Sequence, residues 1–249
     1  RADRRMKMNH KVKKRICALL AGCMALILSG CLYPEGQMQQ NQIPYEESVK
    51  NVEAAVDQFR KENGNLLPIV TKEEDTDYYI KYIIDFKKIV PRYLAEIPSN
   101  AYEEGGVYQY TLIDEEENPT VKLIDLRIAE TIRSVRLQID AQGYPALAEE
   151  VGPNVYKLDY EKMGFREDPT VKSPFSGKDL HLVMSGEGEL YVDYTPDLYD
   201  LLAEGEKSPK ENTDIRPYLM EEALFVPAYS LPYAWDSKEN KPVFLSNQE

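Results

Sequence analysis

The amino-acid sequence predicts an α+β fold made of two tandem, similar modules, each a helix followed by a short antiparallel β-hairpin, with a C-terminal extension. Two helical patterns each end at a glycine that a proline soon follows, which is a common way for a helix to stop. The stretches "YIIDFKKI" (82–89) and "YKLDYEKM" (156–163) share aromatic, apolar, aspartate and lysine positions. After each of them, two alternating stretches flank a polar turn, as in a β-hairpin. Together these observations predict a repeated unit with antiparallel strands.

The first 30 residues have the pattern of an export signal. Residues 1–15 contain eight Lys and Arg and a single Asp, and an apolar run of 13 residues follows from Ile16 to Leu28. A positive segment before an apolar core of about 7–15 residues is typical of a signal peptide, whereas a transmembrane helix needs about 20. We therefore expect residues 1–30 to be a signal peptide and not a membrane span.

Two cysteines lie in short signals that resemble the site cut by bacterial lipoprotein signal peptidase. These are "LAGC", which ends at Cys23, and "LSGC", which ends at Cys31. Cleavage before Cys23 would leave an apolar core of only about five residues, so the sequence favours cleavage before Cys31. The recognition residues are then Leu28, Ser29 and Gly30. The resemblance implies a diacylglyceryl group on the Cys31 sulfur, and two acyl chains anchor a protein stably.

Removal of the signal peptide leaves a strongly acidic chain. Residues 1–30 hold 8 of the 30 Lys and Arg and 1 of the 43 Asp and Glu, so 22 basic and 42 acidic residues remain. Such a surface repels phosphate groups, so nucleic-acid binding is unfavourable and we expect membrane contact through the lipid. With Cys31 acylated and His181 the only remaining histidine, the sequence predicts no thiolate or two-histidine metal site and no cofactor.

A tether and the first module follow the lipidated cysteine. Residues 31–44 are polar, contain Gly and Pro, and predict a flexible tether. The first module, residues 45–123, begins with a helix that ends at Gly64. The apolar face of this helix comprises Val49, Val52, Val56 and Phe59. Asp85 is expected to be the N-cap of a short helical turn, and residues 107–126 are expected to form the hairpin.

The second module, residues 124–203, repeats this order. Its helix ends at Gly143, Asp159 takes the N-cap position, and residues 180–198 are expected to form the second hairpin. The apolar face of this helix comprises Ile128, Ile132, Val135 and Ile139.

The C-terminal extension, residues 204–249, contains the only tryptophan of the chain. The stretch "YAWDSKENKPVFL" (233–245) resembles the first hairpin and predicts a third. Trp235 could anchor a partner, but we favour its packing between this hairpin and a module. His181 alternates with leucines on a predicted strand, so we expect it to face solvent.

Tyrosine is unusually abundant, at 18 residues. Tyr78, Tyr79 and Tyr82 cluster before the first hairpin, and Tyr108 and Tyr110 lie on it. Tyrosines can form a stacking surface for a sugar or a peptide, but they also suit half-buried strands, and we favour the second interpretation. The candidate contact residues for a ligand or partner are Tyr108, Tyr110 and Trp235.

Parts of the chain resemble two known families. "FRKENGNLLP" and "LQIDAQGYP" are similar to the globular part of type II secretion pseudopilins, although the long hydrophobic first helix of pilins is missing from the pattern. The region that begins "CLYPEGQMQQNQIPYEESVKNVEAAVDQFRKENG" resembles Bacillus lipoproteins known as YphF. Some of those are labelled as periplasmic binding proteins of ABC transporters. The resemblance implies a lipid-anchored location and does not imply any particular activity.

The sequence therefore favours a non-catalytic protein on the outer face of the plasma membrane, anchored through Cys31, that binds or scaffolds an unknown envelope protein or ligand. A solute-binding lipoprotein of an ABC transporter is the first alternative, although such receptors normally have parallel sheets in two lobes. A carboxylate-dependent envelope hydrolase is the second alternative. It ranks last, because carboxylate pairs occur by chance among 42 acids and nothing distinguishes two of them.

Overall fold

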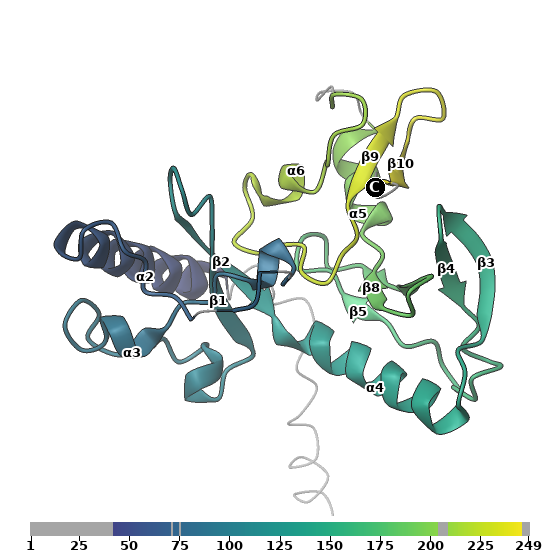
Figure 1. Ribbon diagram of the computed structural model, residues 1–249, viewed down its shortest axis with the longest axis horizontal. Coiled ribbons are helices and arrows are strands. Elements are labelled where there is room, and N and C mark those ends of the chain that lie inside the picture. Colours follow the sequence, from purple (N-terminus) through teal and green to yellow (C-terminus); the bar gives the residue numbers. More distant parts are fainter. Residues whose placement is uncertain (1–41, 71, 75, 204–208, 246–249) are drawn as a thin grey trace, which may run out of the picture. The chain divides into compact units, whose positions relative to one another are not determined.

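Two sets of helices and antiparallel strands follow one another along the described chain, which comprises residues 42–70, 72–74, 76–203 and 209–245 (Figure 1). The predictions for the signal peptide, for Cys31 and for residues 31–41 of the tether lie outside these residues. In the described part of the chain, no helix is both long enough and apolar enough to cross a bilayer.

The first module starts with the longest helix, α2 (Gln42–Glu62). Its buried face includes Val49, Val52 and Val56, as the spacing predicted. The helix begins two residues before Pro44, whereas the sequence placed its start after that proline. Proline fits the first turn of a helix because its missing N–H has no partner there, so it did not mark the end of the tether.

The first hairpin covers a core of its own. Its strands are β1 (Tyr108–Ile113) and β2 (Thr120–Asp125), paired antiparallel from Tyr108↔Asp125 to Ile113↔Thr120, which confirms the predicted hairpin. Three short helices precede it: η2 (Tyr78–Ile80), α3 (Phe86–Ile89) and η3 (Tyr102–Glu104). The core below β1 and β2 is filled by Val52 and Val56 of α2, Ile84, Phe86, Leu112 and Leu123.

Helix α4 (Leu126–Gln142) follows β2 without a linker. The carboxylate of Asp125, the last residue of β2, accepts the Arg127 N–H at 3.0 Å and so caps α4. The helix ends as predicted at Gly143, which has the left-handed conformation (φ 86°). The boundary predicted between residues 123 and 124 therefore falls inside a strand, because one aspartate both completes the hairpin and begins the next helix.

The second module has a larger sheet than the sequence predicted. Its order is β3-β4-β7-β8 and all pairs are antiparallel. The hairpin expected at 180–198 is present as β7 and β8, and helix α5 (Thr195–Leu202) follows it. The strands are β3 (Leu147–Gly152), β4 (Val155–Leu158), β5 (Val171–Lys172), β6 (Asp179–Leu180), β7 (Leu182–Ser185) and β8 (Leu190–Val192).

The two modules repeat individual hydrogen bonds. The Asp85 N–H donates to Pro68 O at 2.7 Å, and the Asp159 N–H donates to Ala146 O at 2.8 Å. Both aspartates then accept a backbone N–H through their side chains, from Lys87 in the first module and from Lys162 in the second. Asp159 caps a turn and not the helical turn predicted there. The internal repeat seen in the sequence thus corresponds to a repeated backbone arrangement.

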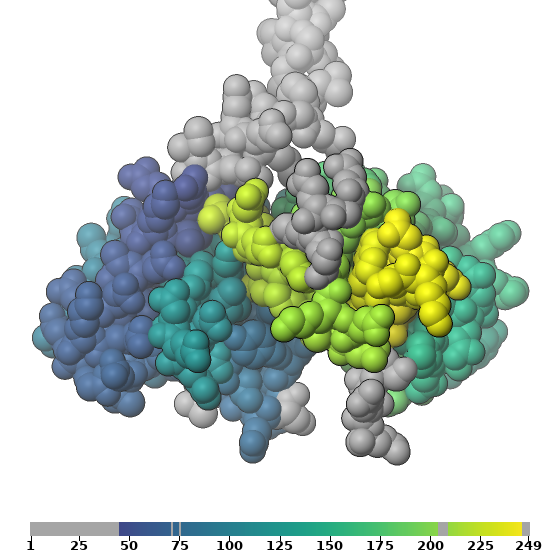
Figure 2. Space-filling view, turned by 90° about the horizontal axis from the view of Figure 1, so that it is seen from above, coloured from purple at the N-terminus to yellow at the C-terminus, as the bar shows by residue number. Residues whose placement is uncertain are grey.

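The C-terminal extension bonds to the edges of both sheets. We call residues 214–230, which include α6 (Pro217–Met220), the strap. Leu123 of β2 donates its N–H to Leu224 O at 2.8 Å and accepts the Val226 N–H at 3.0 Å, and Val192 of β8 donates to Tyr229 O at 2.7 Å. In Figure 2 the yellow-green strap lies between the blue-to-teal first module and the yellow end of the chain.

The chain then forms the predicted third hairpin, β9 (Tyr233–Asp236) and β10 (Lys241–Phe244), which makes a separate two-stranded sheet. Its aromatic residues pack into the core of the second module. A third cluster joins the first module to the strap, and Leu126 of α4 packs against it. Its buried members are Tyr79, Ile83, Ile124, Met220, Val226 and Ala228.

Candidate functional site

Tyr108 and Tyr110 belong to the core of the first module and not to a contact surface. Their exposed fractions are 7% and 1%, and their rings pack edge-on against Phe225 and Phe86 respectively. Their burial argues against the candidate role of these two tyrosines in ligand or partner contact and agrees with the interpretation that we favoured. On β1 both side chains point to the buried face, where Tyr108 contacts Tyr45 of α2 and Phe225 of the strap, so these tyrosines fill a core.

The other singled-out residues in the described chain agree with the interpretations that we favoured. Trp235 is half-buried and packs against the second-module core, as expected for a residue that fixes the third hairpin. His181 is exposed, while Leu180 and Leu182 on either side are each 1% exposed. Cys31, Leu28, Ser29 and Gly30 lie outside the described residues.

A group of two tyrosines and a carboxylate, partly open to solvent, lies beside the tip of the first hairpin. Tyr78 is 41% exposed, and its hydroxyl accepts the Asp114 N–H at 2.8 Å and donates to Glu115 Oε2 at 3.1 Å. The ring of Tyr82 lies 6.0 Å from that of Tyr78, and a hydrogen bond to Glu115 raises the pKa of Tyr82 to about 12. Both tyrosine hydroxyls are thus bonded to the Glu115 carboxylate. We call Tyr78, Tyr82 and Glu115 the tyrosine face.

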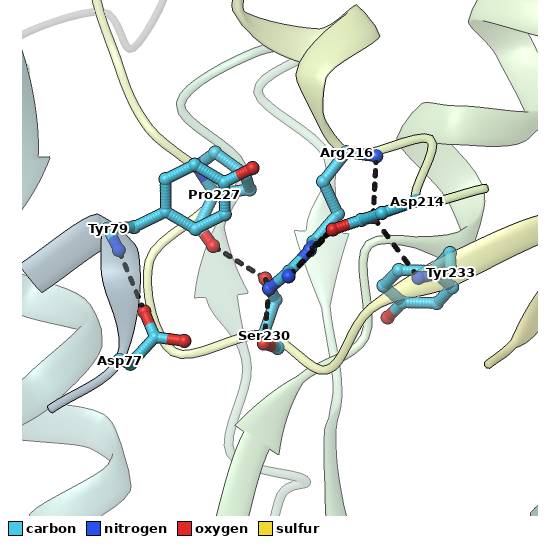
Figure 3. Close-up of polar contacts among 7 residues, drawn as sticks. All are labelled: Asp77, Tyr79, Asp214, Arg216, Pro227, Ser230 and Tyr233. Atoms are coloured by element: carbon cyan, nitrogen blue, oxygen red, sulfur yellow. Dashed lines mark hydrogen bonds and ion pairs between the residues drawn. The ribbon is translucent and has the colours of Figure 1, made fainter. Parts of the chain in front are cut away.

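A second polar group joins the strap to the first module around Arg216 (Figure 3). The Arg216 Nε donates to Asp214 Oδ2 at 2.8 Å, and the Arg216 Nη1 donates to Ser230 O at 2.8 Å. The Arg216 guanidinium lies over the ring of Tyr79, 4.9 Å from its centroid, which is a cation–π contact between the strap and η2. Only 12% of the Arg216 side chain is exposed.

Asp77 lies at the start of η2, within the electrostatic reach of the Arg216 guanidinium. Its Oδ1 accepts the Tyr79 N–H at 3.1 Å, which makes it the N-cap. Burial raises the pKa of Asp77, and the attraction of Arg216 offsets this only in part. Burial also raises the pKa of Tyr79 well above its ordinary value. We call Asp77, Tyr79, Asp214 and Arg216 the latch.

Lys122 of β2 makes a further contact with the strap. Its ammonium group donates to Met220 O at 2.9 Å and to Ala223 O at 2.6 Å, at the C-terminal end of α6. A lysine is favourable there because the last carbonyl groups of a helix lack partners within the helix. Burial lowers the pKa of Lys122. The strap is thus fixed to the first module by backbone pairing, by Lys122 and by the latch.

Asp197 in the first turn of α5 is the other carboxylate whose pKa burial raises. It is 3% exposed, and its Oδ1 accepts the Ser176 hydroxyl. A carboxylate this deeply covered cannot reach a substrate, so it serves the packing of α5 on the turn between β5 and β6. Within the described residues, no three His, Cys, Asp or Glu side chains come together as a metal site.

Sequence reasoning missed the latch. Arg216 and Tyr79 are far apart along the chain, and "TDIRPY" carries no periodicity that would assign Arg216 a partner. The one local signal was the spacing of Asp214 and Arg216, the same Asp-x-Arg as in Asp125 and Arg127. In both cases the aspartate bonds the arginine backbone N–H and its side chain.

Comparison with known proteins supports the first-module resemblance. The model of the YphF family N-terminal domain matches residues 45–125, about a third of the chain. The matched residues run from the first turns of α2 to the last residue of β2. No curated protein and no solved structure matches the chain.

Proposed function

We propose that this chain is a lipid-anchored extracytoplasmic protein that binds or scaffolds another component of the cell envelope without catalysing a reaction. The tyrosine face is the observation that carries this proposal. Tyr78 is exposed and bonds to Glu115, and Tyr82 and Glu115 beside it are half-buried, whereas Tyr108, Tyr110 and Tyr233 fill cores. Rigid, amphipathic tyrosines lose little entropy on binding and are favoured in protein contacts.

The short stretch between Cys31 and the first module supports the proposal that the partner belongs to the cell envelope. Ten residues separate Cys31 from Gln42, where α2 begins. A chain of this length spans at most about 40 Å, so a lipid on Cys31 would keep the first module within that distance of the bilayer. A partner is then a membrane protein, another lipoprotein or an inner wall component.

The anchor is tested by replacing each candidate cysteine. Cys31→Ala is expected to abolish incorporation of radiolabelled fatty acid and to release the protein from the membrane fraction. Cys23→Ala is the matched control and should be labelled normally, because Cys23 lies inside the predicted apolar core. Loss of label in the Cys23 variant, with label retained in the Cys31 variant, would show that the other cysteine is acylated.

The binding surface is tested by photo-crosslinking on intact cells. A photoreactive residue at Glu116, in the tip of the first hairpin beside the tyrosine face, is expected to give a discrete adduct. Tyr78→Ala should reduce its yield about 5–30-fold, the loss expected for a contact residue worth 1–2 kcal/mol. The matched control places the probe at Glu187, in the tip of the equivalent hairpin of the second module.

Two results would contradict the proposal. One is the same adduct pattern from both probes, or none from either. The other is turnover of an envelope substrate by the purified protein, which would favour the hydrolase. A small solute that raises the melting temperature, while the probe at Glu116 gives no adduct, would favour the solute-binding alternative.

A further inference from the structure

A glutamate, a tyrosine and an arginine form a complete triad on the surface beside the C-terminal end of α2. The Tyr93 hydroxyl donates to Glu62 Oε2 at 3.1 Å. The Arg92 guanidinium pairs with the same carboxylate oxygen at 2.7 Å and lies over the Tyr93 ring, 5.1 Å from its centroid. One arginine thus contacts a negative charge and an aromatic ring together, which its planar guanidinium is suited to do.

The tyrosine face contains two of the three parts of this triad. The Tyr78 hydroxyl donates to Glu115 Oε2 at 3.1 Å, which is the same bond at the same length. Lys81 is a nearby cation, but its ammonium group lies over the Tyr82 ring, 5.8 Å from the centroid, and donates to Glu74 O. Among the described residues, no Lys or Arg pairs with Glu115 or lies over the exposed ring of Tyr78. The position that an arginine takes in the triad is therefore open at the tyrosine face.

Two further arginines of the chain also combine a bond to a carboxylate with a tyrosine ring. They are Arg127, with Asp125 and Tyr108, and Arg216, with Asp214 and Tyr79. The tip of the equivalent hairpin in the second module binds an arginine as well, because Arg136 donates to Gly188 O at 2.7 Å and to Glu189 Oε2 at 3.0 Å. Arginine is thus the cation that this chain itself places on such groups.

The charge around the tyrosine face also favours a cationic partner. Asp114, Glu116 and Glu117, in the same hairpin tip, are exposed. Once residues 1–30 are removed, 22 Lys and Arg remain against 42 Asp and Glu in the whole chain. A negative surface attracts a positively charged partner and disfavours a negatively charged one.

We infer that the partner binds the tyrosine face through an arginine, whose guanidinium pairs with the Glu115 carboxylate and covers the Tyr78 ring. The inference rests on the proposed function and specifies the chemistry of the partner, which is a protein segment with an exposed arginine. A lysine in that segment would meet the same charge, but it lacks the planar group that pairs with a carboxylate and stacks on a ring, so it should bind more weakly.

Titration of the purified protein with the peptide acetyl-Arg-Arg-Arg-amide tests the arginine site. The Asp114 N–H donates to the Tyr78 hydroxyl, so its NMR resonance is expected to shift on binding. Glu115→Gln keeps an oxygen that can accept the Tyr78 hydroxyl but loses the charge, and it should weaken binding about 3- to 5-fold, as loss of an exposed ion pair does. Glu187→Gln, in the tip of the second-module hairpin, is the matched control and should bind as the parent protein does. The peptide acetyl-Lys-Lys-Lys-amide should bind the parent protein at least about 3-fold more weakly.

Two results of the titration would overturn the inference. One is equal affinity of the parent protein for the two peptides, and the other is a Glu115→Gln variant that binds the arginine peptide as tightly as the parent protein does.

The crosslinking experiment on intact cells distinguishes this inference from the proposed function. Glu115→Gln should lower the yield of the adduct from the probe at Glu116 by about the same factor as in the titration. An adduct whose yield is unchanged in this variant would overturn the arginine contact alone and would still support the proposed function. Absence of any adduct without this substitution would overturn the proposed function, and the inference with it.

Discussion

Replacing Arg216 with methionine is expected to lower the free energy of unfolding by about 3 kcal/mol, the lower end of the usual cost of removing one partner of a buried ion pair, because 31% of the Asp214 side chain is exposed. Methionine keeps an unbranched apolar stem, but it leaves Asp214 without a counter-charge and removes the donor to Ser230 O. The contact with Tyr79 is lost as well. Urea unfolding, with the slope compared between variants, measures the effect.

Arg92→Met is the matched control for this experiment. Arg92 also pairs with a carboxylate, Glu62, at 2.7 Å and also lies over a tyrosine ring, that of Tyr93, but 73% of its side chain is exposed. Its loss should cost no more than about 1 kcal/mol. Arg216→Met combined with Asp214→Asn should recover part of the lost stability, because the unpaired charge is removed. Equal effects of the two single variants would show that the latch contributes no more than a surface pair.

Tyr233→Ala is expected to cost about 3–5 kcal/mol, as large aromatic deletions in cores do. Tyr233 is completely buried, and its ring lies 4.7 Å from that of Phe244. Its hydroxyl accepts the Tyr194 N–H at 2.9 Å. Tyr233→Phe keeps the ring and leaves that buried N–H without a partner, so it should cost about 1–3 kcal/mol. Thermal unfolding of both variants distinguishes the contribution of the ring to stability from that of the hydroxyl.

Tyr144→Ala is the control for a tyrosine without a packing role. Tyr144 is 61% exposed, and its removal should change the free energy of unfolding by less than about 0.5 kcal/mol. If Tyr233→Phe were as stable as the parent protein, the hydroxyl of Tyr233 would not link the third hairpin to the end of β8.

Local features of the fold were predictable because they are determined by neighbouring residues. The hairpins follow from alternation on both sides of polar turns, and Asp114, with its left-handed backbone, lies at such a turn. The caps at Asp85 and Asp159 follow from an aspartate before a helical or turn segment. These signals lie within ten residues of the element that they specify, so tertiary contacts did not need to be known.

Features that depend on distant residues were not predictable. The strap pairs with Leu123 and Val192 through "LFVPAY", which does not alternate and gives no sign of a strand edge. Strand β3 exposes most of its residues, so it lacks the apolar pattern of a strand. Tyr108 and Tyr110 alternate equally well on a solvent face and a buried face, and only the packing of α2 and the strap decides between them.

Equilibrium unfolding followed by two probes tests most directly whether the strap unites the two modules. Trp235, the sole tryptophan, reports on the third hairpin and the second-module core through its fluorescence. Ellipticity at 222 nm reports on the helices, of which α2 of the first module is the longest. A strap bonded to both sheets predicts one cooperative unit, with the two urea transitions coinciding in midpoint and slope. Separate transitions, with a large part of the ellipticity lost before or after the Trp235 signal, would show that the modules unfold independently and would contradict the account.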